Sequence, residues 1–425
     1  MTDPIEGDVS GEDAGTSFEV LIVGAGPAGT AAAITLARAG VNVAVIDKAK
    51  FPRDKTCGDG LTADALRILE RLGLEPRSVA TWQDADTCWI RSPSGNTTPF
   101  RMPRGRGLFM ATAQRIDLDS ALVDLAREAG ASILDGHGLS TVTQNRHGVV
   151  AEVEGLGTVK ANYVIGADGM WSPLRKALSG SNDSSTDADT GDKYLGEWHA
   201  FRQYFSNVSD AAATDLWIYF EADLVPGYFW SFPLPDGRAN VGFGIQRTSE
   251  TRTKDMKVLW KDLLDRPHIR ELLGPDAIPE DTHRAWPIPA RVERMVPSDG
   301  RALFVGDALG ACDVMSGEGI AQALATGIAA AQAILDHSTP TEVANAYDKA
   351  ATHELLADHR MSSLLVSGLS SERGANMAIA IASYNDWTRR NFARWLFEDY
   401  PRALIATPRR WKRGAVSKPG AYRDR

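Results

Sequence analysis

Three glycines and one acidic residue near the start of the chain have the spacing of a dinucleotide-binding motif. Gly24, Gly26 and Gly29 follow one another as G-x-G-x-x-G, and Asp47 comes about 20 residues later. In such motifs the glycines allow a tight turn, the approach of a pyrophosphate and close helix–strand packing, while the acid binds ribose hydroxyls. An acid here favours free hydroxyls over a 2′-phosphate, so we expect FAD or NAD before NADP.

A strand, a helix and a second strand must position these residues. The apolar runs 18–23 and 41–46 each predict a buried parallel strand. Between them, the small residues of 28–39 predict a helix that directs free N–H groups and the positive end of its dipole at an anion. The sequence therefore predicts a Rossmann-like βαβ unit.

Two later segments also end a predicted buried strand in a glycine and an aspartate. Residues 164–175 read VIGADGMWSPLR and contain Asp168, and 302–307 read ALFVGD and end in Asp307. A helix is expected to begin near Gly319. No second G-x-G-x-x-G follows on a strand–helix unit, so we expect no separate NAD(P) domain. The electron donor would then be transiently bound NAD(P)H or a reduced carrier protein.

Together, the three segments resemble the FAD-binding signature of flavoproteins with the p-hydroxybenzoate hydroxylase fold. The resemblance implies that the first motif holds the ADP half of FAD, that Asp168 braces the pyrophosphate region and that Asp307 contacts the ribityl chain. It also implies that Arg115 touches FAD and that the helix near Gly319 stabilises the anionic reduced flavin. The residues expected to bind FAD are Gly24, Gly26, Pro27, Ala28, Gly29, Asp47, Lys48, Cys57, Gly58, Arg115, Asp168, Gly306, Asp307, Gly317, Gly319 and Ile320.

Two loops are similar to those of the geranylgeranyl reductase family, within a resemblance that covers residues 18–335. The first loop is FPRDKTCGDG at 51–60, and the second is the run from Tyr219 to Pro233, which contains PGYFWSFP at 226–233. Members of this family saturate C=C bonds in polyprenyl chains, so the resemblance implies an FAD-dependent oxidoreductase with a hydrophobic substrate. One departure is that Asp313-Val314-Met315-Ser316 replaces the usual Asn-Pro before Gly-x-Gly-Ile, in a loop expected near the flavin.

Saturating an isolated alkene needs a proton on one carbon and a hydride on the other, with cationic character between them. Aromatic faces stabilise a cation, and Tyr228, Trp230 and Phe232 alternate along a predicted strand, so they share one face. We expect Tyr219, Tyr228 and Trp230 to be catalytic residues in an apolar slot. Cys57 is expected to donate the proton or set the local polarity, because a thiol with a pKa of about 8.5 is mostly protonated at neutral pH.

Composition and charge limit the other classes of function. The 425-residue chain has no run of about 18 apolar residues and no basic-then-apolar leader, so we expect neither a membrane span nor a secretory signal. Three widely spaced cysteines indicate a reducing compartment, no disulfide framework and no metal site, and we expect a cytoplasmic protein. The net charge of −9 argues against nucleic acid as a partner.

The C-terminal stretch 389–425 has the opposite charge. It carries 11 Lys/Arg against 3 Asp/Glu, together with Phe392, Trp395, Phe397 and Trp411. One interpretation is transient contact with an anionic membrane surface, as in a peripheral membrane protein. The other is a helix that packs its aromatic side chains on the acidic body of the protein.

The expected fold is α/β, with an FAD-binding domain of the p-hydroxybenzoate hydroxylase type, an antiparallel substrate-binding β-sheet and a C-terminal helical region. Residues 1–17 predict a disordered tail. The predicted FAD domain is discontinuous, over 18–81, 108–178 and 290–335. The substrate domain would take 82–107 and 179–289, and the helical region 336–425, with its clearest helix at 344–366.

The same fold supports other activities. A flavin monooxygenase would hydroxylate a small molecule, and the Cys-Gly-Asp-Gly loop argues against it. A flavin-dependent halogenase carries Trp-x-Trp-x-Ile-Pro, which 228–233 matches in part, and needs a lysine facing a halide tunnel, for which Lys55 is the nearby candidate. A flavin-loaded lipid carrier without catalysis is the alternative from another class.

Overall fold

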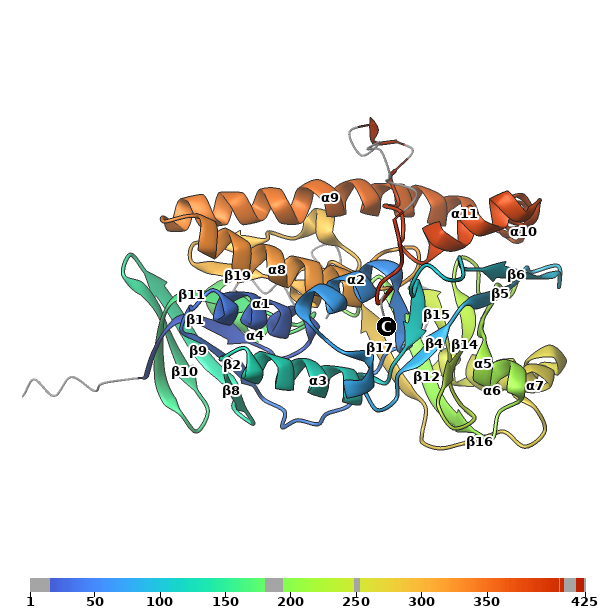
Figure 1. Ribbon diagram of the computed structural model, residues 1–425, viewed down its shortest axis with the longest axis horizontal. Coiled ribbons are helices and arrows are strands. Elements are labelled where there is room, and N and C mark those ends of the chain that lie inside the picture. Colours follow the sequence, from blue (N-terminus) through green and yellow to red (C-terminus); the bar gives the residue numbers. More distant parts are fainter. Residues whose placement is uncertain (1–15, 180–193, 248–252, 405, 409–417, 424–425) are drawn as a thin grey trace, which may run out of the picture.

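The computed structural model describes residues 16–179, 194–247, 253–404, 406–408 and 418–423. Nearly all of the predicted tail 1–17 lies outside the described residues, and so does Trp411. Figure 1 shows two regions of β-sheet side by side, with a long helix, α9 (Pro340–Leu369), running over the first and toward the second.

The first sheet contains the predicted βαβ unit. Its central strand β1 pairs in parallel with β2 on one side and β11 on the other, and the full order is β18-β19-β11-β1-β2-β8. In addition, β10 pairs antiparallel with β11, and β9 pairs antiparallel with β10. The carboxyl ends of β1, β2 and β11 therefore meet at one edge. The strands are β1 (Thr16–Val23), β2 (Val43–Asp47), β8 (Ser132–Asp135), β9 (Leu139–Asn145), β10 (Gly148–Val153), β11 (Gly157–Gly166), β18 (Ser298–Asp299) and β19 (Ala302–Phe304).

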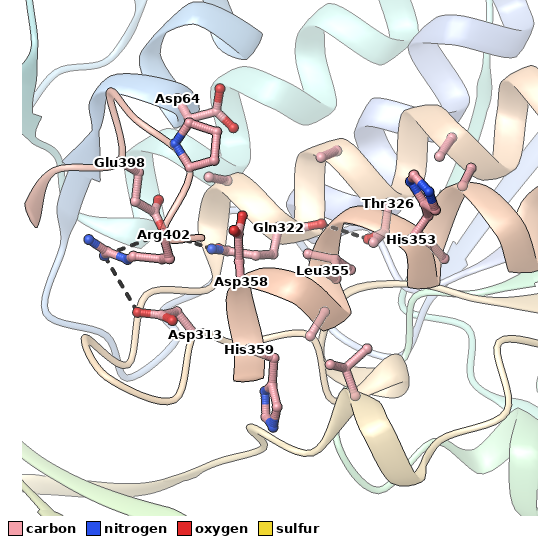
Figure 2. Close-up of a pocket in the computed structure, with 18 of the residues that line it drawn as sticks. Asp64, Asp313, Gln322, Thr326, His353, Leu355, Asp358, His359, Glu398 and Arg402 are labelled. Carbon is pink, nitrogen blue, oxygen red and sulfur yellow. Dashed lines mark hydrogen bonds and ion pairs between the residues drawn. The ribbon is translucent and has the colours of Figure 1, made fainter. Parts of the chain in front are cut away.

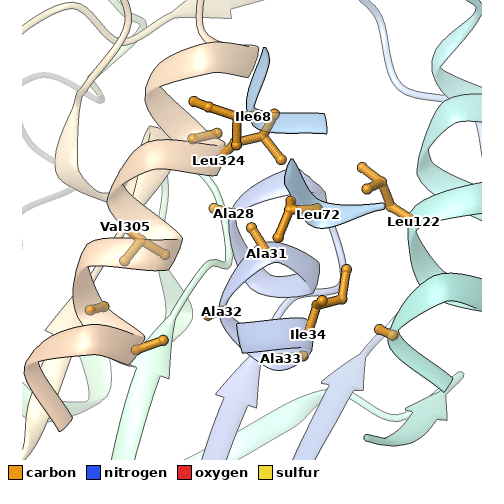
Figure 3. Close-up of a cluster of buried hydrophobic side chains, with 14 of the residues drawn as sticks. Ala28, Ala31, Ala32, Ala33, Ile34, Ile68, Leu72, Leu122, Val305 and Leu324 are labelled. Atoms are coloured by element: carbon orange, nitrogen blue, oxygen red, sulfur yellow. The ribbon is translucent and has the colours of Figure 1, made fainter. Parts of the chain in front are cut away.

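Small side chains let the helices on this sheet pack closely. The alanines of α1 are buried between α8 and α3, as Figure 3 shows. A Cβ added at Gly327 of α8 would lie 2.1 Å from the carbonyl oxygen of Ala28, so the two backbones are nearly in contact. The opposite face is covered by β9, β10 and α4. These helices are α1 (Pro27–Arg38), α2 (Ala63–Leu72), α3 (Arg115–Glu128), α4 (Pro173–Ser179) and α8 (Ile320–Asp336).

The second sheet has the order β16-β12-β15-β14-β13-β5-β6, and β17 also pairs with β12. All of its pairs are antiparallel except β5 with β13, so the predicted antiparallel roof contains one parallel pair. The predicted Asp236-Gly237 turn joins β14 and β15, with both residues at positive φ, 63° and 68°. The strands are β5 (Thr87–Arg91), β6 (Thr97–Arg101), β12 (Trp198–Ser206), β13 (Leu216–Tyr219), β14 (Tyr228–Leu234), β15 (Arg238–Gln246), β16 (Ile278–Pro279) and β17 (Arg284–Ile288).

The two faces of this second sheet have different covers. One face packs against α5 (Asp210–Thr214), α6 (Thr253–Asp265) and α7 (Pro267–Leu273). The other packs against the first domain and against α10 (Glu372–Ser383) and α11 (Asp386–Leu396). A third, small sheet lies at the junction, with strands β3 (Gly60–Thr62), β4 (Gln83–Ala85) and β7 (Met110–Thr112) in the order β3-β7-β4.

The C-terminal region is helical, as predicted. The helix expected at 344–366 is α9, which begins with a capping box between Thr339 and Glu342. In α11, Phe392 packs on Phe100 of β6 with ring centroids 5.3 Å apart, and Trp395 packs on Phe392. The described aromatic side chains of this stretch therefore pack on the body of the protein. Among the described helices, none has the length and apolarity needed to cross a membrane.

Candidate active site

The first glycine turn is tight, and it is open on one side. Gly24 has a φ of +103°, and a Cβ at Gly29 would lie 1.9 Å from the carbonyl oxygen of Gly24. A Cβ at Gly26, in contrast, would meet only the guanidinium of Arg53, at 3.5 Å. The carboxylate of Asp47 accepts a hydrogen bond of 2.8 Å from the amide of Ala25, so it is fixed beside the turn. This leaves room for a pyrophosphate at the start of α1.

The residues around this turn lie as the motif predicts. Pro27 and Ala28 form the first turn of α1, whose N-cap residue supplies no capping side chain, so its N–H groups stay free for an anion. Lys48 is exposed directly after β2.

Asp168 caps α4 and keeps one oxygen without a partner. Its Oδ2 accepts a hydrogen bond of 2.8 Å from the amide of Leu174, whereas its Oδ1 is buried with no hydrogen-bond partner among the described residues. Burial raises the pKa of this carboxyl to about 6. A buried oxygen of this kind is costly unless a donor satisfies it, so it fits a bound ligand.

Asp307 lies at the end of β19, after Gly306 with its φ of +57°. It forms an ion pair with Lys55 at 2.9 Å, from the loop that follows β2. Burial opposes ionisation of Asp307, but the charge of Lys55 outweighs it and holds the pKa of the carboxyl below its ordinary value.

The helix α8 begins with bare backbone, as expected for a flavin-facing end. It starts at Ile320 after Gly319, which provides no side-chain cap, and Gly317 before it has a φ of +72°. A Cβ at Gly319 would lie 2.8 Å from the sulfur of Cys312, so only glycine fits. The first N–H groups of α8 are free to bind an anionic ring edge.

Cys57 lies between the two domains, beside Arg115. Burial raises the pKa of the Cys57 thiol, and the nearby guanidinium of Arg115 opposes that rise. Arg115 is held by two hydrogen bonds of 2.8 Å to Asp119. The thiol therefore stays protonated at neutral pH.

Asp59, two residues after Cys57, anchors this loop to the second sheet. It is fully buried at a positive φ of 65°, and its Oδ2 accepts hydrogen bonds from Asn240 (2.7 Å) and from the hydroxyl of Tyr204 (2.8 Å). Burial raises its pKa to about 6. Sequence reasoning missed Asn240 and Tyr204. The available signal was a side chain with a hydrogen-bonding group on each of two largely buried strands, Tyr204 on β12 and Asn240 on β15.

The aromatic run forms one wall, as predicted. Tyr228, Trp230 and Phe232 lie along one face of β14. The ring centroids of Tyr228 and Trp230 are 6.1 Å apart, and those of Trp230 and Phe232 are 6.3 Å apart. Trp230 packs on Gly242, where a Cβ would come within 2.4 Å of the indole, and a Cβ at Gly58 would lie 3.6 Å from it. The wall and the Cys57 loop are therefore adjacent.

Tyr219 lies on the face of the second sheet opposite to the aromatic wall. The prediction that it lines the slot is therefore wrong. It pairs in register with Phe229, one residue away from Trp230, and its ring packs on Phe229 and His268. Because side chains alternate between faces along a strand, a residue paired with Phe229 points away from Trp230. We withdraw Tyr219 from the catalytic residues.

The loop that departs from the family pattern is held from three directions. Asp313 accepts a hydrogen bond of 2.6 Å from Ser362 of α9 and lies 3.5 Å from the guanidinium of Arg402. The hydroxyl of Tyr228 donates to the carbonyl of Ser316. The C-terminal segment, α9 and β14 therefore all contact this loop and fix it in place.

A third residue that sequence reasoning missed, Glu318, precedes α8. Its Oε1 would lie 3.6 Å from a Cβ at Gly60, and the ring of Phe232 would lie 3.2 Å from the same point, so the carboxyl is next to the aromatic wall. Burial and the charge of Glu398 raise its pKa to about 8. The Gly-Glu-Gly sequence was the available signal, since an acid between two turn glycines is conspicuous at a helix start.

Glu398 connects this region to a cavity. The cavity has a volume of about 750 Å³ and lies between α8, α9 and the segment 398–402, as Figure 2 shows. Glu398 accepts hydrogen bonds of 2.8 Å from Gln322 and from Thr62, and it lies 3.8 Å from Arg402. Burial raises its pKa to about 7.

Comparison with known proteins identifies the family. Residues 17–353 match the family model of the FAD binding domain. The chain is 31% identical over 352 residues to a menaquinone reductase of Mycolicibacterium smegmatis, covering 75% of this chain and 76% of that protein. It is 33% identical over 342 residues to digeranylgeranylglycerophospholipid reductase 2 of Methanopyrus kandleri, covering 78% and 81%. This chain belongs to the geranylgeranyl reductase family of FAD-dependent oxidoreductases.

Solved structures confirm the fold of this reductase-family protein. A geranylgeranyl bacteriochlorophyll reductase-like protein of Thermoplasma acidophilum superposes with a TM-score of 0.74 at 21% identity, covering 92% of this chain and 98% of that one. The flavin-dependent brominase Bmp2 shares the fold with a TM-score of 0.70 at 19% identity, covering 94% and 97%. The cofactor is FAD. The open turn at Gly26, the unpaired Oδ1 of Asp168 and the bare start of α8 fit its pyrophosphate, its central region and its ring.

Proposed function

We propose that this protein saturates C=C bonds in the polyprenyl chain of a lipid. One observation carries the proposal: the Cys57 loop, an aromatic wall and the uncapped start of α8 meet at a single junction. The two relatives described above, named as reductases of menaquinone and of a digeranylgeranyl phospholipid, support the same substrate class.

Bound FAD, once reduced, supplies the hydride. The aromatic wall of Tyr228, Trp230 and Phe232 forms the apolar surface of the substrate slot. Its rings exclude water, contact a branched prenyl chain and stabilise developing positive charge. Each of these three side chains lies on the side of β14 that faces the Cys57 loop. A transiently bound NAD(P)H or a reduced carrier protein provides the electrons.

Two acids supply the proton in this proposal. Cys57 donates it from Sγ, since its raised pKa keeps the thiol protonated until a carbon accepts the proton. Glu318 then reprotonates the Cys57 thiolate, because the carboxyl, with a pKa of about 8, is the stronger acid of the two. Glu398 lines the cavity of Figure 2, and its charge acts on Glu318. In this proposal it relays protons from the cavity to Glu318.

The other activities of the fold are less well supported. A halogenase needs a lysine that faces a halide tunnel, and Lys55 is ion-paired with Asp307 instead. We also propose the division of labour predicted from the sequence, with FAD held by 18–81, 108–178 and 290–335 and the substrate by the second sheet.

Mass spectrometry of the product tests the function. The FAD-loaded protein is reduced with dithionite and mixed with a menaquinone or a geranylgeranyl lipid. We expect a product heavier by two hydrogens for each bond saturated. A product that gains oxygen in air, or a halogen in the presence of halide, would contradict the proposal in favour of a hydroxylase or a halogenase.

A further inference from the structure

Four large apolar side chains project from one corner of the protein. Met377, Ile381 and Tyr384 are 65%, 63% and 82% exposed, and Trp387 at the start of α11 is 71% exposed. The first three are spaced i, i+4, i+7 from α10 into the turn that follows it, so they share one side of the helix. We call these four residues the α10–α11 patch. Large apolar side chains that are exposed together are typical of an interaction surface.

The opposite side of the same two helices covers the aromatic wall. Ile379 and Ala382 of α10 are buried in one hydrophobic cluster with Trp230 and Phe232. The amide of Ser94, in the β5–β6 turn, donates a hydrogen bond of 3.0 Å to Asn376 and supports α10 from the side. The α10–α11 pair is therefore a single layer, with the proposed prenyl slot on its inner side and the patch on its outer side.

The charge beside the patch is positive. Arg389, Arg390 and Arg101 lie near Asp386. They lower the pKa of its carboxyl, and the largest contributions are the hydrogen bond and the charge of Arg389. Arg390 and Arg101 are exposed, as is Arg373 on the first turn of α10. Apolar and aromatic side chains flanked by arginines match the boundary between the headgroups and acyl chains of an anionic bilayer.

We propose that the α10–α11 patch docks the protein on an anionic lipid bilayer. The proposal rests on the proposed function. Docking through the patch would place the α10–α11 layer, which covers the proposed prenyl slot, against the membrane that contains the polyprenyl lipid. Tyr384 and Trp387 insert at headgroup depth, Met377 and Ile381 contact acyl chains, and the arginines bind lipid phosphates. This surface replaces the tail aromatics as the contact, because the described ones, such as Phe392 and Trp395, pack on the body.

Vesicle sedimentation of the full-length, FAD-loaded protein tests the proposal. Vesicles are made of phosphatidylcholine alone or of equal parts phosphatidylcholine and phosphatidylglycerol. The double variant Ile381→Ser/Trp387→Ser should bind the anionic vesicles about tenfold more weakly. Arg389→Gln/Arg390→Gln should reduce the preference for anionic over neutral vesicles. The matched control is Val258→Ser on α6, which removes a side chain with 70% exposure far from the patch and should bind as wild type does.

Two results would overturn the docking proposal. One is equal vesicle binding by wild type and the Ile381→Ser/Trp387→Ser variant. The other is a wild-type dimer in analytical ultracentrifugation that this variant dissociates, which would make a second copy of the chain the occupant of the patch.

Reduction of a detergent-dispersed geranylgeranyl lipid separates this proposal from the proposed function. The patch variant should reduce that substrate as fast as wild type, because the slot is intact. If the wild type reduces no prenyl lipid while vesicle binding still depends on the patch, the proposed function fails and the docking stands.

Discussion

The side-chain amide of Asn240 donates a hydrogen bond of 2.8 Å to the backbone carbonyl of Cys57. The same amide nitrogen lies 2.7 Å from Asp59, and the amide oxygen accepts from the indole of Trp230 at 3.1 Å. One side chain on β15 therefore fixes the Cys57 loop against the aromatic wall of the second sheet. Because the loop follows β2 of the first sheet and β15 belongs to the second, this contact sets the spacing between the proposed proton donor and the wall.

Replacement of Asn240 by leucine should loosen that loop. We expect FAD to stay bound, the rate of prenyl reduction to fall at least about tenfold, and the free energy of unfolding to fall by about 1–3 kcal/mol, because Asp59 loses a donor while buried. Urea denaturation and stopped-flow kinetics measure these effects. Ser231→Ala is the control, since the buried hydroxyl of Ser231 has no hydrogen-bond partner among the described residues. Its removal should change neither the rate of reduction nor the free energy of unfolding. Wild-type rates in Asn240→Leu would refute the positioning role.

Cys57→Ala should retain FAD and lose alkene reduction, because the alanine has no proton to give. Flavin absorbance checks the first expectation, and product analysis checks the second. Cys88→Ala is the matched control, since Cys88 is a fully buried thiol on β5, two strands away from β14, and its loss should leave turnover close to wild type. Unchanged turnover in Cys57→Ala would reject the thiol as the proton source.

The pH profile tests Glu318. Its folded pKa of about 8 means that the carboxyl is protonated below that pH and ionised above it, so steady-state turnover should fall as the pH rises through about 8. In Glu318→Gln this limb should disappear. The first turnover should keep its rate, because the Cys57 thiol is already protonated, while later turnovers slow. An identical alkaline limb in the variant would assign it to another group.

Gly29→Ala should abolish FAD binding, because its Cβ would lie 1.9 Å from the carbonyl oxygen of Gly24 and force the turn open. Purified protein should be colourless, and its flavin-to-protein ratio should not recover on incubation with FAD. Gly368→Ala on α9 is the control, since a Cβ at this position meets nothing within 4 Å. The purified control protein should stay yellow. A yellow Gly29→Ala protein would show that the turn tolerates the change.

The FAD domain was predictable from sequence because its chemistry is local. Gly24, Gly29 and Asp47 lie within one βαβ unit, so their spacing along the chain already determines their spacing in space. The alternation of Tyr228 and Trp230 was equally local, and one strand suffices to put them on one face.

The rest of the site depends on register between strands and on contacts between domains. Tyr219 was misplaced because the register of β13 against β14 is set by tertiary pairing, and a shift of one residue reverses its face. Asn240 contacts the Cys57 loop from β15, and Arg402 contacts Asp313 from the C-terminal stretch. These contacts join segments that are distant in sequence, so no local pattern predicts them.

Anaerobic mixing of the reduced protein with substrate tests the central claim most directly. The FAD-loaded protein is reduced with one equivalent of dithionite, freed of oxygen and mixed with a geranylgeranyl lipid while the absorbance of oxidised flavin is followed. We predict that the yellow colour returns without oxygen, with one alkene saturated for each flavin reoxidised. Flavin that stays reduced until air is admitted, with the alkenes intact, would contradict the account.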